Sequence, residues 1–263
     1  MIHRNAAKSD RTHFETMLES GGVIDGFFPA TAMPDSVWWE ALWPQPGKVL
    51  TDLGIEREMT VIDLCCGEGL FTAALARMAR NVVAIDLDPE MVEIAQARVA
   101  AVGTTNCTFV VGDAYDVAMF VPEPTDFVLI ANKFHGVPDK QRLAQAVATV
   151  LKPAGRFAIV NWHRRPREET TVFGQPRGPH TELRMTPDDV AAAVEPAGFI
   201  LAGVVELPPY HYGAIFQKTA AWPLSRRWRA TWRMSRTNRR SRGLAAREAI
   251  ILTSKTKREE KPS

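Results

Sequence analysis

The sequence predicts an α/β fold in which a doubly wound, mostly parallel seven-stranded sheet ends in an antiparallel hairpin. Two observations predict it. Between residues 58 and 218, short apolar runs alternate with amphipathic helical patterns, which is typical of a parallel sheet covered on both faces. After residue 198, two apolar runs follow one another with no helical pattern between them, so these strands should pair antiparallel.

The predicted elements alternate as far as residue 162. In chain order, strands are predicted at 60–64, 82–87, 107–113, 126–132 and 155–162, and helices at 69–79, 88–100 and 140–151. Their boundaries have local signals: Asp88 is a typical N-cap followed by proline, and Pro153 stops the third helix. A further helix at 186–199 begins with Thr186 as its N-cap. The last two strands, within 199–218, are joined by "ELPPYHYG".

Composition restricts the class of protein. At 263 residues and 46% hydrophobic, the chain can bury a full core, and we expect one domain with appendages. Its three cysteines provide no disulfide framework, which is typical of a reducing compartment. The opening residues lack the apolar core of a signal peptide, and no run approaches the roughly 18 apolar residues of a membrane span. The sequence therefore predicts a cytoplasmic protein without a membrane span.

Charge divides the chain into an acidic body and a basic tail. Residues 219–263 contain 13 Lys or Arg and 3 Asp or Glu, whereas residues 1–218 contain 19 and 27. We therefore expect an N-terminal helical and aromatic lid segment (1–57), a main domain (58–218) and a basic, poorly ordered tail. The tail alternates arginines with Trp222, Trp228 and Trp232. This composition is typical of a segment that binds nucleic acid or an anionic membrane, and the alternative is an extension without a role.

A glycine loop follows the first predicted strand. Gly67 and Gly69 lie between that strand and the next helix, where glycine lets the backbone approach a ligand and helix N–H groups favour an anion. Ligands of open α/β sheets bind at the carboxyl ends of the strands, where this loop lies. Asp86 ends the second strand, at the position suited to hold a pair of ribose hydroxyls, and Asp113 ends the third.

A nicotinamide or flavin site is the alternative for such a loop. Its G-x-G-x-x-G/A fingerprint requires a small residue at the position that Thr72 occupies here. The acids also recur on three strands rather than on one. Nicotinamide binding is therefore less favoured.

Several motifs follow one another in a fixed order: "VIDLCCGEG", "VVAIDLDPEM", "VVGDAY", "DFVLIANKFHGVPD" and "LKPAGRFAIVNW". Together they resemble the motifs of the class I S-adenosylmethionine-dependent methyltransferases with a type 11/25-like domain, the first being similar to D-x-G-x-G-x-G. The resemblance spans about residues 58–218. It implies a Rossmann-like methyltransferase fold, the cofactor S-adenosyl-L-methionine and in-line transfer of a methyl group to a small-molecule acceptor.

The resemblance also implies cofactor-binding positions. Asp86 would hold the ribose hydroxyls, Asp113 would lie near the adenine amino group, and Ala114 would offer its backbone. The positions expected to contact the cofactor are Asp63, Cys65, Gly67, Gly69, Asp86, Leu87, Asp113, Ala114 and Asn132. Cys65 replaces the family's first glycine, which puts strain on the loop. Cys65 and Cys66 are then loop residues, and because adjacent cysteines do not form a standard zinc site, we expect no metal.

Methyl transfer depends mainly on the positioning of nucleophile and methyl group, and a general base matters only for an acceptor that is protonated at neutral pH. His135, just past the fourth strand, and His163, after the fifth, are the catalytic candidates, with a hydrogen-bonded loop histidine as the alternative for each. The long loop after the fifth strand and the final hairpin add polar candidates: Arg164, Arg165, Arg167, Glu168, Glu169, Arg177, His180, Arg184, Tyr210, His211 and Tyr212.

The aromatic segment before the first strand has two interpretations. Trp38, Trp39 and Trp43 have helical spacing and could pack the outer face of the domain. Alternatively, Phe27, Phe28 and Trp39 form a lid over cofactor and acceptor.

Two other functions remain open. An RNA methyltransferase could use the basic tail as its anchor, although "NKFHGVPD" lacks the (N/D)PP(Y/F) loop typical of enzymes that methylate exocyclic base amines. A non-catalytic module could keep the cofactor loop without an acceptor site. The sequence specifies no oligomeric state.

Overall fold

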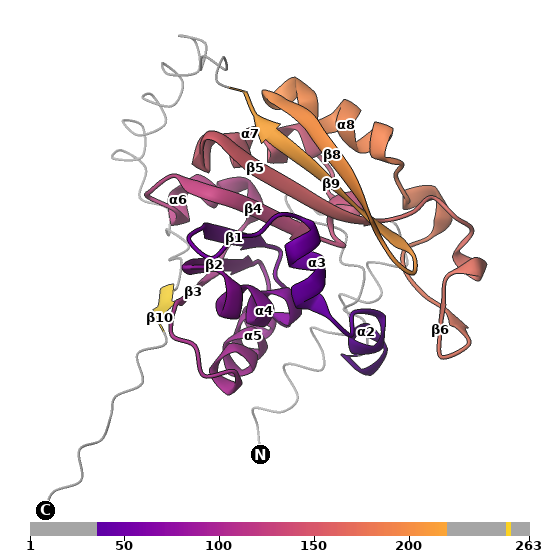
Figure 1. Ribbon diagram of the computed structural model, residues 1–263, viewed down its shortest axis with the longest axis horizontal. Coiled ribbons are helices and arrows are strands. Elements are labelled where there is room, and N and C mark those ends of the chain that lie inside the picture. The colour runs from indigo at the N-terminus through magenta and orange to yellow at the C-terminus, as the bar shows by residue number, and fades with distance from the viewer. Residues whose placement is uncertain (1–35, 220–250, 254–263) are drawn as a thin grey trace, which may run out of the picture.

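A computed structural model describes residues 36–219 and 251–253 of the chain. Within them, one large mixed sheet lies between two layers of helices (Figure 1). Its strands are β1 (Thr60–Leu64), β2 (Asn81–Asp86), β3 (Cys107–Val111), β4 (Thr125–Ala131), β5 (Leu151–Trp162), β8 (Phe199–Leu207), β9 (His211–Lys218) and β10 (Ile251–Thr253). Their order across the sheet is β10-β3-β2-β1-β4-β5-β9-β8.

The seven predicted strands are all present, with the predicted directions. Strands β1 to β5 pair parallel to one another, and β9 pairs antiparallel with both β5 and β8. The absence of a helix between β8 and β9 thus produced the expected hairpin. An eighth strand, β10, pairs antiparallel with β3 and comes from the region expected to be a tail. It lies in a short apolar run, residues 249–253, which is not among the predicted strands.

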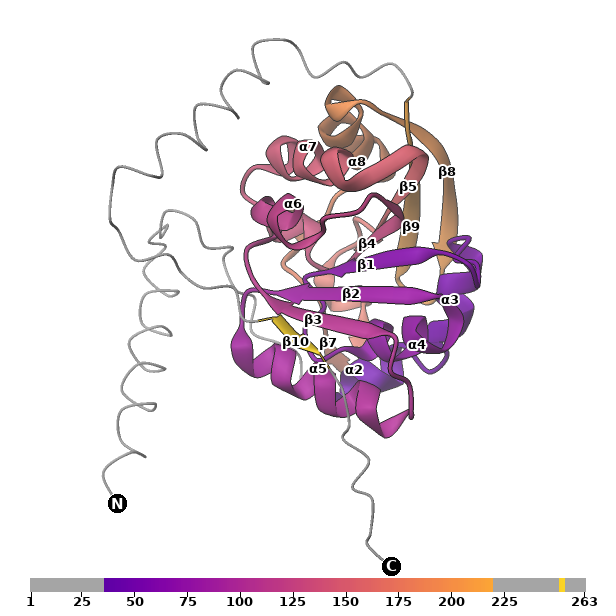
Figure 2. The ribbon, with the colours of Figure 1, turned by 90° about the vertical axis from the view of Figure 1, so that its left-hand side faces the viewer.

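Helices cover both faces of the sheet, as Figure 2 shows. On one face lie α3 (Pro46–Asp52), α4 (Leu70–Met78) and α5 (Pro89–Ala101); on the other lie α6 (Val117–Phe120), α7 (Lys140–Val150) and α8 (Pro187–Val194). The short helix α2 (Ser36–Leu42) precedes them and lies against β6 (Thr171–Val172). Together, the covered faces confirm the doubly wound arrangement.

The core consists of two apolar layers separated by the sheet. Successive strand side chains point to opposite faces. Ile62 of β1 therefore packs in one layer with Val147 of α7, whereas its neighbour Val61 packs in the other with Leu75 of α4. All four side chains are fully buried. The continuous apolar runs of the sequence thus correspond to strands that are buried on both sides.

Two predicted helix starts have the expected caps. The Asp88 carboxylate accepts a hydrogen bond from the Glu90 N–H at 2.9 Å, with proline at the first helical position. Thr186 forms a capping box with Asp189 at the start of α8, in which each side chain accepts from the other residue's backbone N–H. Local sequence signals thus set these helix boundaries.

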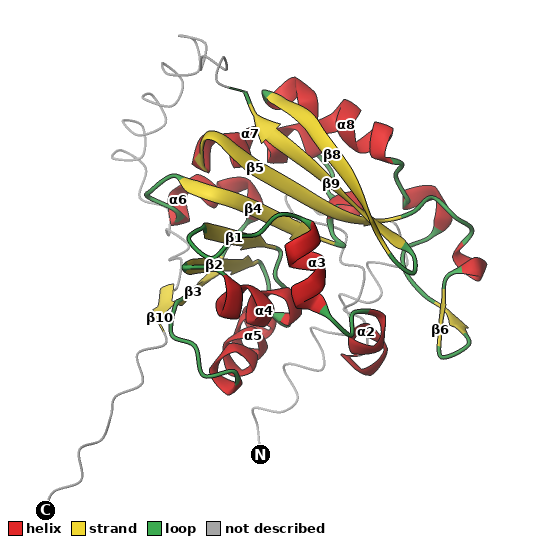
Figure 3. Cartoon of the chain, viewed as in Figure 1, coloured by secondary structure: helices red, strands yellow, loops and turns green. Residues whose placement is uncertain are grey.

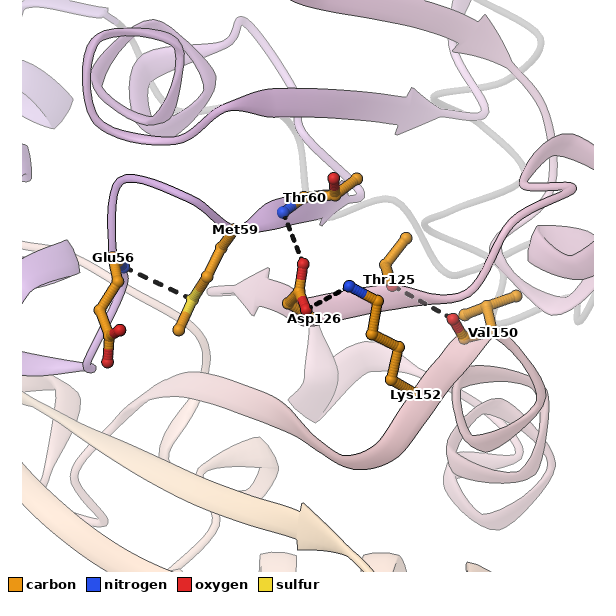
Figure 4. Close-up of polar contacts among 7 residues, drawn as sticks. All are labelled: Glu56, Met59, Thr60, Thr125, Asp126, Val150 and Lys152. Atoms are coloured by element: carbon orange, nitrogen blue, oxygen red, sulfur yellow. Dashed lines mark hydrogen bonds and ion pairs between the residues drawn. The ribbon is translucent and has the colours of Figure 1, made fainter.

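Hydrogen bonds to one carboxylate connect three strands at the edge of the sheet where β1 and β4 begin. Asp126 of β4 accepts hydrogen bonds from the Thr60 N–H at 2.9 Å and from the Lys152 ammonium at 2.5 Å (Figure 4). Burial alone would raise the pKa of Asp126, but the hydrogen bonds from Lys152 and Thr60 hold it below its usual value. This carboxylate therefore links the starts of β1, β4 and β5.

The segment between β5 and α8 leaves the sheet as a long excursion, spanning residues 163–186 (Figure 3). It contains the two-stranded hairpin of β6 and β7 (Gln175–Pro176) and the short 3₁₀ helices η3 (Arg167–Glu169) and η4 (Thr181–Leu183). Arg184 fastens it from within: its guanidinium donates to the Pro179 carbonyl, the Thr170 hydroxyl and the Arg177 carbonyl. The long loop of the sequence is therefore an ordered structure with its own hydrogen bonds.

Two groups of predicted residues fall outside the described part of the chain. They are the lid residues Phe27 and Phe28 and the tail residues Trp222, Trp228 and Trp232. For the helices that the structure does describe, none has both the length and the apolar character needed to cross a membrane.

Candidate functional site

The candidate site lies at the carboxyl ends of the parallel strands, where the connections of the chain change face. β1 pairs with β2 on one side and with β4 on the other. The helix that follows β1 covers one face of the sheet, and the main helix that follows β4 covers the opposite face. Because ligands of open α/β sheets bind at such switch points, the loops after β1 and β4 define the site.

The loop after β1 has the left-handed backbone that its glycines allow. Three of its residues have a positive φ: Cys65 at 60°, Gly67 at 54° and Gly69 at 76°. Gly69 is also required by a close approach, because a Cβ there would lie 2.7 Å from the Cβ of Ala95 in α5. Cys65 adopts this conformation with a side chain, at a cost of about 1–2 kcal/mol. The strain expected at Cys65 is therefore present in the backbone.

Two acids, Asp86 at the end of β2 and Asp113 two residues after β3, accept hydrogen bonds from the neighbouring backbone. Asp86 accepts hydrogen bonds from the Gly67 N–H at 2.8 Å and from the Asp88 N–H at 3.1 Å. Asp113 accepts from the Tyr115 N–H at 2.9 Å. Each carboxylate oxygen can accept more than one hydrogen bond, so both acids retain acceptor capacity for hydroxyl or amino groups.

A cavity of about 220 Å³ lies at this edge of the sheet. It is bounded by the loop after β1, the loop after β4, the helix α2 and the excursion after β5. Among the predicted cofactor-binding and catalytic positions, those that line it are Asp63, Cys65, Gly67, Asn132 and His135, and the polar candidates Arg167 and Arg177 line it as well. The structure thus brings together residues from two strand ends that lie about 70 positions apart in the sequence.

The remaining predicted cofactor-binding and catalytic positions lie off the lining of this cavity. Those at the start of α4 and at the ends of β2 and β3 are Gly69, Asp86, Leu87, Asp113 and Ala114. His163 also lies off the lining, and its Nε2 is 2.9 Å from a carboxylate oxygen of Glu206 on β8. His180 is exposed. Of the candidate histidines, only His135 lines the cavity.

Asn132, directly after β4, combines a strained backbone with a buried side chain whose polar atoms have no hydrogen-bond partner in the described part of the chain. Its φ is 60°, in the left-handed region, while its backbone N–H donates to the Val160 carbonyl at 2.9 Å. The side chain is 8% exposed, and neither its oxygen nor its nitrogen has a hydrogen-bond partner among the described residues. Buried amide groups without partners are rare, because each costs about 1–3 kcal/mol.

Asp63, at the end of β1, is buried below the cavity. Its Oδ2 accepts a hydrogen bond of 2.6 Å from the Thr72 hydroxyl. Burial raises the pKa of Asp63 to about 7 against this hydrogen bond, and the negative charge of Asp86 adds to the rise. Thr72 stands where a nicotinamide-binding loop has a small residue, and its hydroxyl donates a hydrogen bond to Asp63.

His135 is held neutral in the short helix η2 (Phe134–Gly136). Its side chain is 7% exposed, and Nδ1 lies 3.4 Å from Asn161 Oδ1. Burial lowers the pKa of His135 to about 4, against the hydrogen bond with Asn161. Because the amide oxygen can only accept, Nδ1 carries the proton and Nε2 is the basic nitrogen. At neutral pH this ring is an acceptor for a hydroxyl group.

Aromatic rings form a wall of the cavity. Trp38 and Trp39 of α2 line it, as does Trp162 at the end of β5, whereas Trp43 is buried in the core against Phe71. The packing interpretation therefore holds for Trp43, and the lid over cofactor and acceptor stays a prediction. Trp162 was not singled out in the sequence, although its place at the end of a predicted strand was a signal for it.

Burial favours the uncharged forms of His211, Cys65 and Cys66. The His211 ring lies between Trp43 and Trp162, with centroid distances of 4.4 and 4.1 Å, and burial lowers its pKa well below the usual value. Burial likewise raises the pKa of both Cys65 and Cys66, so these thiols stay protonated. Within the described residues, no group of three or more His, Cys, Asp or Glu could hold a metal ion.

Comparisons with known proteins agree with this arrangement. Residues 61–155 match a family described as a methyltransferase domain. The chain is 32% identical over 138 residues to a ubiquinone biosynthesis O-methyltransferase from Xanthomonas euvesicatoria, covering 49% of this chain and 57% of that protein. Its counterpart from Xylella fastidiosa is 30% identical over 133 residues, which cover 47% and 54%. The chain therefore spans a little over half the length of these relatives.

A solved structure has the same fold over most of the described residues. The crystal structure of an S-adenosylmethionine-dependent methyltransferase from Aquifex aeolicus superimposes with a TM-score of 0.59 at 26% identity, covering 71% of this chain and 99% of that one. The matched family region begins at β1 and ends within β5, so it contains the loops after β1 and β4.

Proposed function

We propose that this chain, whose residues 61–155 match a methyltransferase-domain family, transfers a methyl group from S-adenosyl-L-methionine to a hydroxyl group of a small molecule. The observation that carries this proposal is the cavity between the loop after β1 and the loop after β4. It combines a strained glycine loop with an amide, Asn132, whose polar atoms have no partner among the described residues.

The residues present fit this cofactor. Asp86 retains acceptor capacity for the ribose hydroxyls, and Asp113 with Ala114 would hold the adenine ring. The loop from residue 65 to 69, together with Asn132, would hold the amino-acid end. When bound, S-adenosyl-L-methionine supplies a methyl group on a positively charged sulfur, so the protein has to position the acceptor rather than trap a developing charge.

His135 would orient the acceptor. A neutral imidazole that donates from Nδ1 to Asn161 offers Nε2 to a hydroxyl hydrogen, which directs an oxygen lone pair away from the ring. As the oxygen gains the methyl group, its proton passes to Nε2. A pKa of about 4 makes His135 a weak base, so we assign most of its effect to orientation.

Oxygen as the acceptor atom is supported by the relatives, which are named O-methyltransferases. The chain spans a little over half of those proteins, so their own substrate is not assigned to it. All three cysteines are free thiols, which suits a reducing compartment such as the cytoplasm. We propose a small-molecule acceptor in that compartment, with nucleic acid as an alternative that depends on the tail.

The proposal is tested by incubating the full chain with methyl-labelled S-adenosylmethionine and a panel of phenols, catechols, hydroxybenzoates and aliphatic alcohols, with transfer RNA as a separate arm. We expect label in a hydroxylated small molecule. His135→Gln should lower kcat for that acceptor at least tenfold and leave cofactor affinity unchanged. His163→Gln is the matched control, because His163 pairs with Glu206 outside the cavity, and we expect less than a twofold effect.

Other outcomes would contradict the proposal. Cofactor binding with no labelled product would favour a non-catalytic binding module. Label in RNA that disappears at high salt or on removal of residues 219–263 would favour the RNA methyltransferase.

A further inference from the structure

We propose that the acceptor is a planar aromatic molecule that carries an anionic group, with its ring against the tryptophans of the cavity and its anionic group on Arg177. This inference rests on the proposed function and specifies its substrate class. Three features of the cavity lead to it: the aromatic wall, an excess of positive charge and the position of one guanidinium.

The aromatic wall favours a flat ligand. Trp38 and Trp39 lie edge to face, with centroids 5.7 Å apart and planes at 88°. Trp162 also lines the cavity from the end of β5, but it is only 2% exposed, because Tyr210 stacks with its ring at 6.1 Å and 11° and His211 packs against it. The half-buried Trp38 and Trp39 therefore offer most of the indole surface. Indole faces and edges bind aromatic rings better than they bind flexible chains, because offset and edge-to-face contacts add to the buried area.

The charge of the lining favours an anion. The cationic residues that line the cavity are Lys133, Arg167 and Arg177, and none of them forms an ion pair with a described carboxylate. Of the two acids on the lining, Glu68 lies 3.7 Å from Arg98, and Asp63 has its pKa raised to about 7 by burial. The positive groups are therefore not neutralised from within the described protein.

Arg177 is placed to receive the anionic group. Its guanidinium lies 5.3 Å from the centre of the Trp38 ring, and its Nε is buried without a hydrogen-bond partner among the described residues. The Arg177 carbonyl accepts from Thr170 and Arg184, which fixes the backbone from which the side chain extends. A guanidinium that lies over an indole ring keeps N–H groups available, and its planar edge matches a carboxylate with two hydrogen bonds.

Arg167 supports this placement from the other side of the excursion. Its Nε donates to the Gly178 carbonyl at 3.0 Å, directly beside Arg177. Gly178 itself adopts a φ of 87° and has no room for a side chain, because a Cβ would lie 2.8 Å from the Trp162 ring. The excursion, the indole of Trp162 and the two arginines thus form one packed unit over the site.

The test measures binding of three probes to the full chain saturated with S-adenosylhomocysteine, by calorimetry and by quenching of tryptophan fluorescence. The probes are 3,4-dihydroxybenzoate, which is aromatic and anionic, catechol, which is aromatic and neutral, and cyclohexanecarboxylate, which is anionic without an aromatic ring. We expect 3,4-dihydroxybenzoate to bind at least tenfold more tightly than either of the others.

Variants then test the guanidinium. Arg177→Gln should weaken binding of 3,4-dihydroxybenzoate at least tenfold, while affinity for catechol and for S-adenosylhomocysteine stays within twofold. Arg177→Lys should recover part of the loss, because it restores the charge without the planar edge. Arg165→Gln is the matched control: Arg165 is an exposed arginine of the same excursion that does not line the cavity.

Three results would overturn the inference. Equal binding of the three probes, or no binding of 3,4-dihydroxybenzoate, would exclude an aromatic, anionic molecule as the acceptor class. A loss of S-adenosylhomocysteine affinity in Arg177→Gln, with unchanged affinity for 5′-methylthioadenosine, would assign Arg177 to the carboxylate of the cofactor instead. Failure of the wild-type chain to bind S-adenosylhomocysteine would contradict the proposed function itself, so the two failures are distinguishable.

Discussion

Cys65 shows how one residue can depart from a family pattern and keep the backbone that the pattern requires. Its φ of 60° is in the left-handed region, which glycine adopts without strain, and its side chain packs against the core. Burial raises the pKa of its thiol, so the residue is not a nucleophile. We therefore attribute to Cys65 a structural role in the loop.

This role predicts the outcome of paired substitutions. Cys65→Gly and Cys65→Ala both remove the thiol, but only glycine relieves the left-handed strain, so the glycine variant should be the more stable of the two by about 1 kcal/mol. Urea unfolding of the two variants measures the difference. Both should bind S-adenosylhomocysteine within threefold of the wild type, and loss of binding in both would instead indicate a role for the thiol.

At the residue scale, the sheet edge of positions next to a strand end could be predicted, whereas the excursion gave only a set of polar candidates, of which Arg167 and Arg177 line the cavity. Asp63, Asn132 and His135 follow or end apolar runs, so the sheet edge on which they lie follows from the strand assignment. The approach of Arg177 and Trp162 depends on how residues 163–186 fold back over that edge. No periodicity or motif in the sequence specifies that path.

At the scale of elements, the hydrogen bonds of Asp126 to Thr60 and Lys152 predict a change in the free energy of unfolding without a change in ligand binding. Asp126→Asn keeps one acceptor oxygen but loses the ion pair with Lys152, and we expect it to lower the free energy of unfolding by about 0.5–1 kcal/mol at pH 7. The pKa of Asp126 is lowered in the folded state, so this contribution is present above the unfolded pKa of about 3.9 and is lost as the pH falls further.

Urea unfolding of the wild type and Asp126→Asn across pH 2 to 7 checks this prediction. Convergence of the two free energies at low pH is the expected result, with an unchanged affinity for S-adenosylhomocysteine. A difference that persists below pH 3 would show that the carboxylate's charge is not the source of the effect.

Helix starts and strand directions could be predicted at this scale because their causes are local. The caps at Asp88 and Thr186 and the antiparallel hairpin of β8 and β9 depend on residues that are neighbours in the sequence. The pairing of β10 with β3 joins segments about 140 residues apart, and a run of three residues contains too little pattern to specify such a partner.

At the scale of the whole molecule, the sheet order places the two halves of the site together. β1 and β4 are neighbours in the sheet although two strands and three α-helices separate them in the chain, so the loop with Gly67 and the loop with Asn132 share one cavity. The fold could be predicted to this level because the order of strand and helix patterns is nearly sufficient to specify a doubly wound sheet. The proposed boundaries at residues 57 and 218 remain predictions.

The central claim is that this edge of the sheet binds S-adenosylmethionine, and calorimetric titration of the full chain with S-adenosylhomocysteine tests it most directly, with NADH as the parallel ligand. We predict micromolar binding of S-adenosylhomocysteine, no binding of NADH, and a loss of at least about 1.5 kcal/mol in Asp86→Ala, as for a lost charge-assisted hydrogen bond. Binding of NADH, failure of S-adenosylhomocysteine to bind, or an unchanged affinity in Asp86→Ala would contradict the account.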